Sequence, residues 1–247
     1  TGGAGFIGSH IVDRLLKNGL EVTVLDNLST GSPENLIVHH GNPNFSFVKG
    51  DVRDKRMVER AIRNAEVVFH EAAFVGVPQS VKEPFLANDV NVNGTLVLLD
   101  AAVKSNVECF IFASSAVVYG EQKRVPIKED AMPIPNSPYA ASKLAAESYI
   151  TAYSRAFGLN ASSLRYFNVY GQRQSDVYET AITAFVGCLA RDSPPIVYGD
   201  GEQTRDFINV KDVVEANILV TGSKYSGEIF NVATGSPTTI NGLLELL

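Results

Sequence analysis

The sequence predicts an α/β fold built on a doubly wound parallel sheet, and three observations support this. Segments 21–26, 45–51, 66–72 and 107–115 are short and almost continuously apolar, as strands buried on both faces are. Segments with helical spacing lie between them, at 8–19, 54–64 and 91–105. A glycine-rich turn comes first. Strands that alternate with helices form right-handed βαβ units, whose helices cover both faces of one sheet.

The chain opens with TGGAGFIGSH, in which Gly2, Gly5 and Gly8 are spaced by three and lead into a helix. Such a turn lets the backbone approach a phosphate, and the N–H groups and dipole of the helix N-terminus favour an anion. A tight strand–helix turn without a ligand is the alternative. The strand that feeds this turn is expected before Thr1. Because TTINGLLELL at 238–247 begins a helix that stops after two turns, the C-terminal end is also expected to be missing.

Carboxylates end the next two predicted strands. Asp26 follows the glycines by about 20 residues, where a carboxylate can accept both hydroxyls of an adenosine ribose. It would repel a 2′-phosphate, which favours NAD over NADP. Asp51 ends the following strand at the same edge, where it either meets the adenosine or caps a helix. The predicted helices over 54–64 and 91–105 are expected to begin at Asp54 and Asn91, both good capping residues.

Composition excludes several classes of function. The 247 residues are 45% hydrophobic and carry a net charge of −6, so the basic footprint of a nucleic-acid partner is absent. No apolar run reaches the roughly 18 residues that span a membrane. The only two cysteines, Cys109 and Cys188, sit among apolar residues, which predicts buried thiols in a reducing, cytoplasmic compartment. A disulfide or metal site is not expected without clustered histidines.

The motif SPYAASK predicts acid–base chemistry. Tyr139 and Lys143 are four residues apart and share one face of a helix. A phenol normally has a pKa near ~10. A neighbouring ammonium favours the phenolate, which makes Tyr139 a candidate base. Ser115 ends segment 107–115, at the strand end where ligands bind in open α/β sheets. An exposed Tyr–Lys pair on the surface is the alternative.

Taken together, TGGAGFIG, Tyr139-x-x-x-Lys143 and the strand end SS-x-x-VYG resemble the extended short-chain dehydrogenase/reductases. The similarity is greatest to the nucleotide-sugar epimerases, above all those that act on UDP-glucose and UDP-galactose. Further matching motifs are HEAA at 70–73, NVNGT at 91–95, RYFNVYG at 165–171 and YGDGEQTRDFINVKD at 198–212. The resemblance implies an NAD-binding Rossmann domain over 1–166. It also implies a partial substrate-binding region over 167–247, interleaved with the first.

The resemblance also implies roles for single residues. The residues implied to bind NAD, in chain order, are Gly2, Gly5, Phe6, Ile7, Gly8, Asp26, Asn27, Ser29, Thr30, Gly31, Asp51, Val52, Ala72, Ala73, Asn91, Tyr139, Lys143 and Phe167. The residues implied to contact a UDP-sugar are Ser115 and Tyr139 at the reacting hydroxyl, Asn168 and Arg205 at the diphosphate, and Tyr198 beside the uridine. Asn168 as a turn residue, Arg205 as a surface charge and Tyr198 as apolar packing are the alternatives. No metal is expected.

The activity implied is inversion of the C4 hydroxyl of a UDP-hexose through a 4-keto sugar, with Tyr139 as the base. Whether the hexose is N-acetylated stays open, although HEAAFVGVPQS at 70–80 looks like members that accept N-acetyl sugars. The chain departs from well-known members at Val75 and at GQRQ, 171–174. A homodimer is expected, because relatives pair the helices over 91–105 and 139–157, and both carry broad apolar faces here.

Three rival functions remain. Related 4,6-dehydratases and UDP-glucuronate decarboxylases carry a carboxylate two residues after the Ser or Thr at the strand end, where this chain has Ala116 and Val117. A non-catalytic NAD-binding regulator usually lacks the Tyr or the Lys, and both are present. A structural or interaction module would not need this set of residues.

Overall fold

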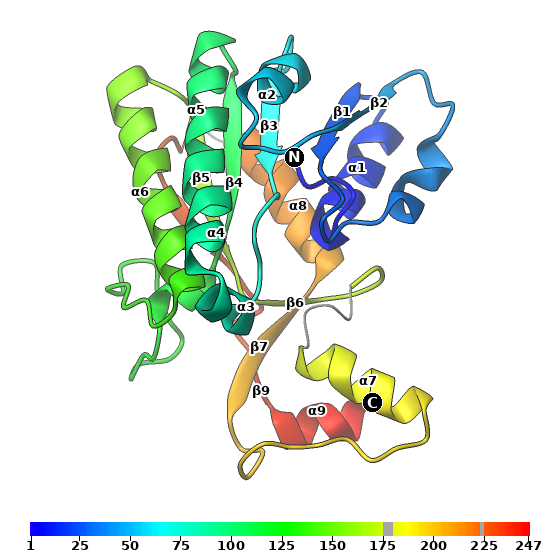
Figure 1. The fold of residues 1–247 in the computed structure, drawn as a ribbon. Helices are drawn as coiled ribbons and strands as arrows, with labels where there is room; N and C mark the ends of the chain where they lie inside the picture. Colours follow the sequence, from blue (N-terminus) through cyan, green and yellow to red (C-terminus); the bar gives the residue numbers. More distant parts are fainter. Residues whose placement is uncertain (175–179, 223–224) are drawn as a thin grey trace.

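The computed structural model describes residues 1–174, 180–222 and 225–247 (Figure 1). The polar sequence YGQRQSD at 170–176 predicts a loop, and its residues 175 and 176 lie outside the described residues. The body of the molecule is a parallel sheet covered by helices on both faces, so the predicted fold class is confirmed. Its strands are β1 (Val22–Asp26), β2 (Phe45–Lys49), β3 (Val67–His70), β4 (Cys109–Ser115), β5 (Ala161–Tyr166) and β8 (Ile229–Val232).

Hydrogen bonds join these strands in two groups, β1–β2 and β3–β4–β5–β8, and every pairing within them is parallel. The first two residues of the chain bridge the groups. The Gly2 N–H donates to Leu25 O at 3.0 Å, and the Thr1 amino group donates to Phe69 O at 2.7 Å. The glycine loop is thus held at the carboxyl ends of β1 and β3, in the middle of the sheet.

Two layers of helices bury the sheet (Figure 1). Helices α2 (Lys55–Ala61), α5 (Gly94–Lys104) and α6 (Pro138–Phe157) cover one face, where Phe110, Phe112 and Ile150 form a continuous core. Helices α1 (Phe6–Lys17) and α8 (Val210–Thr221) cover the other face, and Val213 packs there against Ile111 and Leu164.

Local chemistry explains where most of the helices begin. Asp54 caps α2 as expected, since its side chain accepts the N–H groups of Arg56 and Met57. Ser137 caps α6, which has a proline at its first turn and ends at Gly158, a glycine with a φ of +70°.

The expected cap at Asn91 is wrong. The helical course begins with α3 (Val77–Lys82) and α4 (Pro84–Asn88), and a π-helical turn, η2 (Asp89–Asn93), joins α4 to α5. Asn91 therefore lies inside a helix. Its amide is used for a tertiary contact rather than for capping.

A smaller region extends from the carboxyl edge of the main sheet (Figure 1). Strands β6 (Asn168–Tyr170) and β7 (Thr204–Asn209) are parallel, and β9 (Pro237–Thr239) pairs antiparallel with β7. Helices α7 (Ala181–Ala190) and α9 (Ile240–Leu246) pack together through Phe185, Ile240 and Leu243. The short 3₁₀ helices η1 (Pro33–His39) and η3 (Ala116–Tyr119) complete the elements of the described chain.

The cysteines behave differently from each other. Cys109 is buried on β4 as expected, whereas Cys188 on α7 is only half-buried, so the prediction of a buried thiol is wrong there. Both are free thiols. Among residues 1–174, 180–222 and 225–247, no helix combines the length and the apolarity that a bilayer crossing requires. The same residues hold no cluster of three or more His, Cys, Asp or Glu side chains suited to a metal ion.

Candidate active site

The glycine loop forms a close-packed cradle at the N-terminus of α1. Gly2 has a φ of +69°, and a Cβ there would lie 2.5 Å from Ala72 N. A Cβ on Gly8 would lie 2.2 Å from Gly2 O. No side chain caps α1 at Gly5, so no capping group competes for the N–H groups of its first turn, at Phe6 and Ile7. Backbone that approaches this closely, with a helix N-terminus behind it, fits the diphosphate of a dinucleotide.

Asp26 connects this loop to the next segment. It ends β1, is 8% exposed, and accepts hydrogen bonds from Ala4 N at 2.9 Å and Leu28 N at 2.8 Å. The loop over 28–32 folds back on the glycine turn, where Ser32 N donates to Ala4 O at 3.0 Å. A Cβ on Gly31 would lie 2.9 Å from the carbonyl carbon of Ala4. This packing fixes the Asp26 carboxylate beside the glycine turn.

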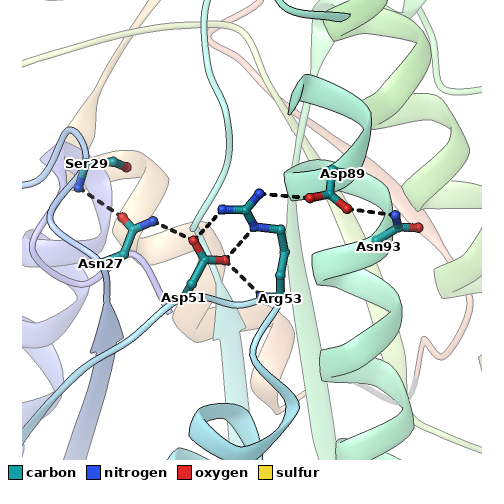
Figure 2. A network of polar contacts seen from close by, with 6 residues as sticks. All are labelled: Asn27, Ser29, Asp51, Arg53, Asp89 and Asn93. Atoms are coloured by element: carbon teal, nitrogen blue, oxygen red, sulfur yellow. Dashed lines mark hydrogen bonds and ion pairs between the residues drawn. The ribbon is translucent and has the colours of Figure 1, made fainter. Parts of the chain in front are cut away.

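A polar network extends from this point across the edge of the sheet (Figure 2). Asn27 accepts from Ser29 N and donates to Asp51 Oδ2 at 2.9 Å, while Arg53 bridges Asp51 and Asp89 with contacts of 2.8 Å to each. The hydrogen bond from Arg53 holds the pKa of Asp51 well below its usual range. The helix-cap alternative for Asp51 is wrong, because Asp54 caps α2.

The expected contacts beneath the cofactor come from the segment after β3. The Ala72 backbone lies against Gly2, and Ala73 follows it in the same loop. Asn91 is buried, accepts from Phe74 N at 2.8 Å, and donates to Phe74 O and to Ser142 Oγ. It therefore pins this loop to η2 and α6. The Val52 side chain is 5% exposed and belongs to the core, which leaves its backbone for any contact with adenine.

Tyr139 and Lys143 occupy the first two turns of α6, facing the carboxyl end of β4. Lys143 is 2% exposed, and its Nζ donates to Ala113 O at 2.8 Å and lies 4.8 Å from the Phe112 ring centre. The alternative of an exposed Tyr–Lys pair is therefore wrong for Lys143. Burial lowers the pKa of Lys143 to about 8, although the carboxylates of Glu71 and Glu147 oppose this shift.

The neighbours of the pair come from separate elements. The Tyr139 N–H donates to Ser80 Oγ of α3 at 3.1 Å, and the Tyr139 side chain is half-buried. Ser115 ends β4, where its Oγ accepts from Val117 N at 3.3 Å. Phe167 directly follows β5 and donates its N–H to Val232 O at 3.1 Å. The three elements thus converge on one edge of the sheet.

The expected substrate residues lie on the smaller region. Asn168 is in β6 opposite Phe207 of β7, and the exposed Arg205 is two residues before Phe207, so register places both on one face of this sheet. The turn alternative for Asn168 is wrong. Tyr198 is 82% exposed in the loop between α7 and β7, so its apolar-packing alternative is also wrong.

Sequence reasoning missed three charged residues around the site, of which two are buried and Glu71 is half-buried. Glu71 accepts from the Tyr166 hydroxyl at 2.8 Å, and its burial raises its pKa to about 7. Glu147 and Arg165 form an ion pair of 2.7 Å beneath α6. A signal for Glu147 was available, because Tyr139, Lys143 and Glu147 repeat at every fourth residue of one helix.

Comparison with known proteins fits this geometry. The model of the NAD dependent epimerase/dehydratase family matches residues 1–233. The chain belongs to this family. A dTDP-glucose 4,6-dehydratase of Actinoplanes sp. is similar to the chain, with 37% identity over 257 residues, which cover 100% of this chain and 79% of the relative.

Solved structures of family members superpose closely. The UDP-N-acetylglucosamine 4-epimerase of Methanobrevibacter ruminantium M1, in complex with UDP-N-acetylmuramic acid, has a TM-score of 0.95 and 43% identity over 99% of this chain and 78% of that one. The UDP-glucose 4-epimerase of Thermus thermophilus, in complex with NAD, has a TM-score of 0.90 and 42% identity over 99% of this chain and 79% of that one. The cofactor of the family is NAD, and the cradle formed by Gly2, Gly8 and the N-terminus of α1 fits it.

Proposed function

We propose that the protein inverts the C4 hydroxyl of a UDP-hexose in an NAD-dependent reaction. The observation that carries this proposal is the Tyr139–Lys143 pair on α6, with Lys143 buried and bonded to Ala113 O of β4, two residues before Ser115. A buried ammonium one helical turn from a phenol stabilises the phenolate, so Tyr139 can act as a base near neutral pH.

In this proposal the site residues divide the work of proton transfer and substrate binding. Tyr139 removes the proton from the C4 hydroxyl, and Ser115 shares a hydrogen bond with the same oxygen. NAD supplies the acceptor, and later the donor, of the C4 hydride. Asn168 and Arg205 hold the diphosphate through charge-assisted contacts while the 4-keto sugar presents its other face. Tyr139 then returns the proton, which yields the inverted alcohol.

A 4,6-dehydratase is the second candidate, because one relative that covers the whole chain has that activity. Dehydration needs an acid beside the strand end. The residues after Ser115 are Ala116 and Val117, which begin η3 and carry no acidic group. Inversion at C4 needs no such acid, so this chain favours epimerisation.

The N-acetyl group is the open part of the specificity. Structures of both an N-acetylglucosamine epimerase and a glucose epimerase resemble the chain at more than 40% identity. We propose UDP-glucose and UDP-galactose as substrates, with the N-acetylated forms as further ones. Turnover of UDP-glucose compared with UDP-N-acetylglucosamine decides between them, and formation of a 4-keto-6-deoxy sugar would favour the dehydratase.

Replacement of the base tests the mechanism. Tyr139→Phe keeps the ring but removes the ionisable hydroxyl. We expect NAD and UDP-sugar affinities close to those of the unmodified protein and a kcat lower by about 10²–10⁴-fold, the usual contribution of a positioned acid–base group. A variant that keeps more than half of its epimerase activity would show that Tyr139 is not the base.

We further propose that 1–166 bind NAD, that 167–247 contribute to the sugar-nucleotide site, and that the protein works as a cytoplasmic homodimer. The apolar face of α6 supports the dimer: Tyr149 is 40% and Phe157 60% exposed, and the rings of Tyr153 and Phe157 are 4.9 Å apart. Two free thiols are typical of a reducing compartment. Light scattering at micromolar concentration tests the dimer, and a monomer mass would contradict it.

A further inference from the structure

A buried ion pair lies directly beneath the proposed catalytic helix. Glu147 of α6 and Arg165 of β5 are each 2% exposed. Arg165 donates to both carboxylate oxygens of Glu147, from Nε at 2.9 Å and from Nη2 at 2.7 Å. The Ser114 hydroxyl of β4 donates to the same carboxylate at 2.5 Å. One carboxylate thus joins a helix to two neighbouring strands.

Two of these three attachment points are close in the chain to proposed site residues. Glu147 is one turn after Lys143 and two turns after Tyr139, on the same face of α6. Ser114 immediately precedes Ser115, and it lies opposite Arg165 in the register of β4 and β5. The ion pair therefore fixes how the helix that carries the base sits over the ends of these strands.

Stability alone does not account for this pair. Removing two charges from water costs several kcal/mol per ion, and apolar residues of similar size are often as stabilising in such places. The pair is also incompletely satisfied, because Arg165 Nη1 is buried and has no hydrogen-bond partner among the residues that the structure describes. Its guanidinium instead lies 4.5 Å from the ring centre of Tyr119. A buried charged pair this close to the proposed reacting groups points to a role for its charge.

That charge acts on Lys143. Burial disfavours the Lys143 ammonium, and Glu147 is one of two carboxylates whose charge restores it, the other being Glu71. Titratable groups lie on α6 itself and on every side of it except α4. They are Tyr139, Glu147, Tyr149, Tyr153 and Arg155 on α6, Lys82 on α3, Asp89 on η2, Asp100 and Lys104 on α5, Cys109 on β4, Tyr119 on η3, Arg165 and Tyr166 on β5, and His70 and Glu71 at the end of β3. Burial lowers the pKa of His70, which leaves that ring neutral, and Asp89 is paired with Arg53. Tyr166 donates its hydroxyl to Glu71.

We propose that Glu147 is a positioning residue for the Tyr139–Lys143 pair. It ties the helix face to the ends of β4 and β5 and carries a negative charge that keeps Lys143 protonated. This inference rests on the proposed function for its effect on turnover. Its effect on Lys143 itself does not need a substrate.

Two substitutions at one position separate charge from shape. Glu147→Gln keeps the shape of the side chain and removes the charge, whereas Glu147→Asp keeps the charge and shortens the reach. Asp100→Asn is the control, because Asp100 is an exposed carboxylate on the neighbouring α5 that pairs with Lys104 at 2.6 Å. The double variant Glu147→Leu with Arg165→Met leaves no unpaired buried charge, which protects the measurement if Glu147→Gln does not fold.

The first readout is the titration of Lys143 by NMR in selectively labelled, NAD-loaded protein. We expect Glu147→Gln to lower the midpoint by about one pH unit, the lower end of the effect of a close opposite charge. Glu147→Asp and Asp100→Asn should leave it in place. An unchanged midpoint in Glu147→Gln, or in the double variant if the single one is unfolded, overturns the proposal.

The second readout is turnover of UDP-glucose. If the midpoint falls from about 8 by one unit, the protonated fraction of Lys143 at pH 8 decreases by about fivefold, and kcat should follow with little change in KM. A lower melting temperature with an unchanged pH profile of kcat would indicate a structural role alone and would also overturn the proposal. If the unmodified protein turns over neither UDP-glucose nor UDP-N-acetylglucosamine, the proposed function fails, while the Lys143 titration still tests Glu147.

Discussion

Replacement of Asp26 separates two roles of one carboxylate. Its oxygens accept the N–H groups of Ala4 and Leu28, which holds the glycine turn against β1. The same group is expected to accept the ribose hydroxyls of NAD and to repel a 2′-phosphate. Asp26→Ala removes both the backbone contacts and the expected ribose contacts. Replacing a carboxylate that has similar backbone contacts elsewhere in the chain would remove backbone contacts alone.

The magnitudes follow from the contacts. A hydrogen bond to a charged group contributes about 1.5 kcal/mol or more, so the loss of two should destabilise the protein by about 3 kcal/mol. For a chain of this size that lowers the melting temperature by about 6–12 °C. Each lost hydrogen bond to the ribose should have a similar free energy. The ratio of the NADP to the NAD dissociation constant should therefore fall by about tenfold or more.

Calorimetric titration with NAD and with NADP gives the decisive ratio. Structural damage to the glycine turn weakens both cofactors alike, so the ratio of the two dissociation constants isolates the contact at the 2′ position. Asp206→Ala is the matched control, because Asp206 accepts Thr234 N at 2.9 Å and Gly235 N at 2.7 Å in the smaller region. A ratio that is unchanged in Asp26→Ala would refute the reasoning, as would a similar fall in Asp206→Ala.

Two further predictions follow from the site. Gly8→Ala places a Cβ 2.2 Å from Gly2 O, so it should lower the free energy of unfolding by about 1–3 kcal/mol and markedly weaken NAD binding. Gly187→Ala in α7 is the control, because its Cβ would meet only the Arg191 guanidinium at 3.4 Å. In the same melting and binding assays that variant should be neutral or stabilising. Lys143 should make epimerase activity fall as the pH rises through about 8, because the ammonium that favours the phenolate is then lost. Stability should move the opposite way between about pH 8 and 10, since the unfolded chain, with a lysine pKa near 10.4, still binds the proton that the folded chain has released. Parallel melting curves and pH–rate profiles check this, and a joint fall of both would mean unfolding instead.

Local patterns in the sequence were sufficient for much of the fold. The strands β1 to β4 and the helices that follow the glycine turn, β2 and β3 could be predicted, because continuous apolar runs and helical periodicity reflect burial on both faces of a sheet. Segment 21–26 contains β1, and the helix expected from Tyr139 to Phe157 differs from α6 by one residue. Asp54 could be assigned as a cap because capping depends only on neighbouring N–H groups.

Long-range contacts explain what the sequence could not predict. Asparagine is a residue type that often caps helices, but Asn91 lies inside a continuous helical course, and its side-chain amide bonds to the backbone of Phe74. The pairing of Glu147 with Arg165 depends on how α6 lies over β5, which no local pattern specifies. Cys188 lies in an apolar stretch, yet α7 belongs to the smaller region, where less of the helix is covered.

The sequence of β5 bears on the register in which this strand pairs with its neighbours. Every residue of β5 is buried, and its sequence, ASSLRY, has no alternating hydrophobic pattern to distinguish its two sides. Arg165 turns toward Glu147 on α6, while Tyr166 bonds to Asn217 on α8 at 2.7 Å. A slip of one residue would bury the guanidinium against α8 and leave Glu147 facing a phenol. The ion pair with Glu147 and the hydrogen bond with Asn217 are therefore both formed only in the observed register of this central strand.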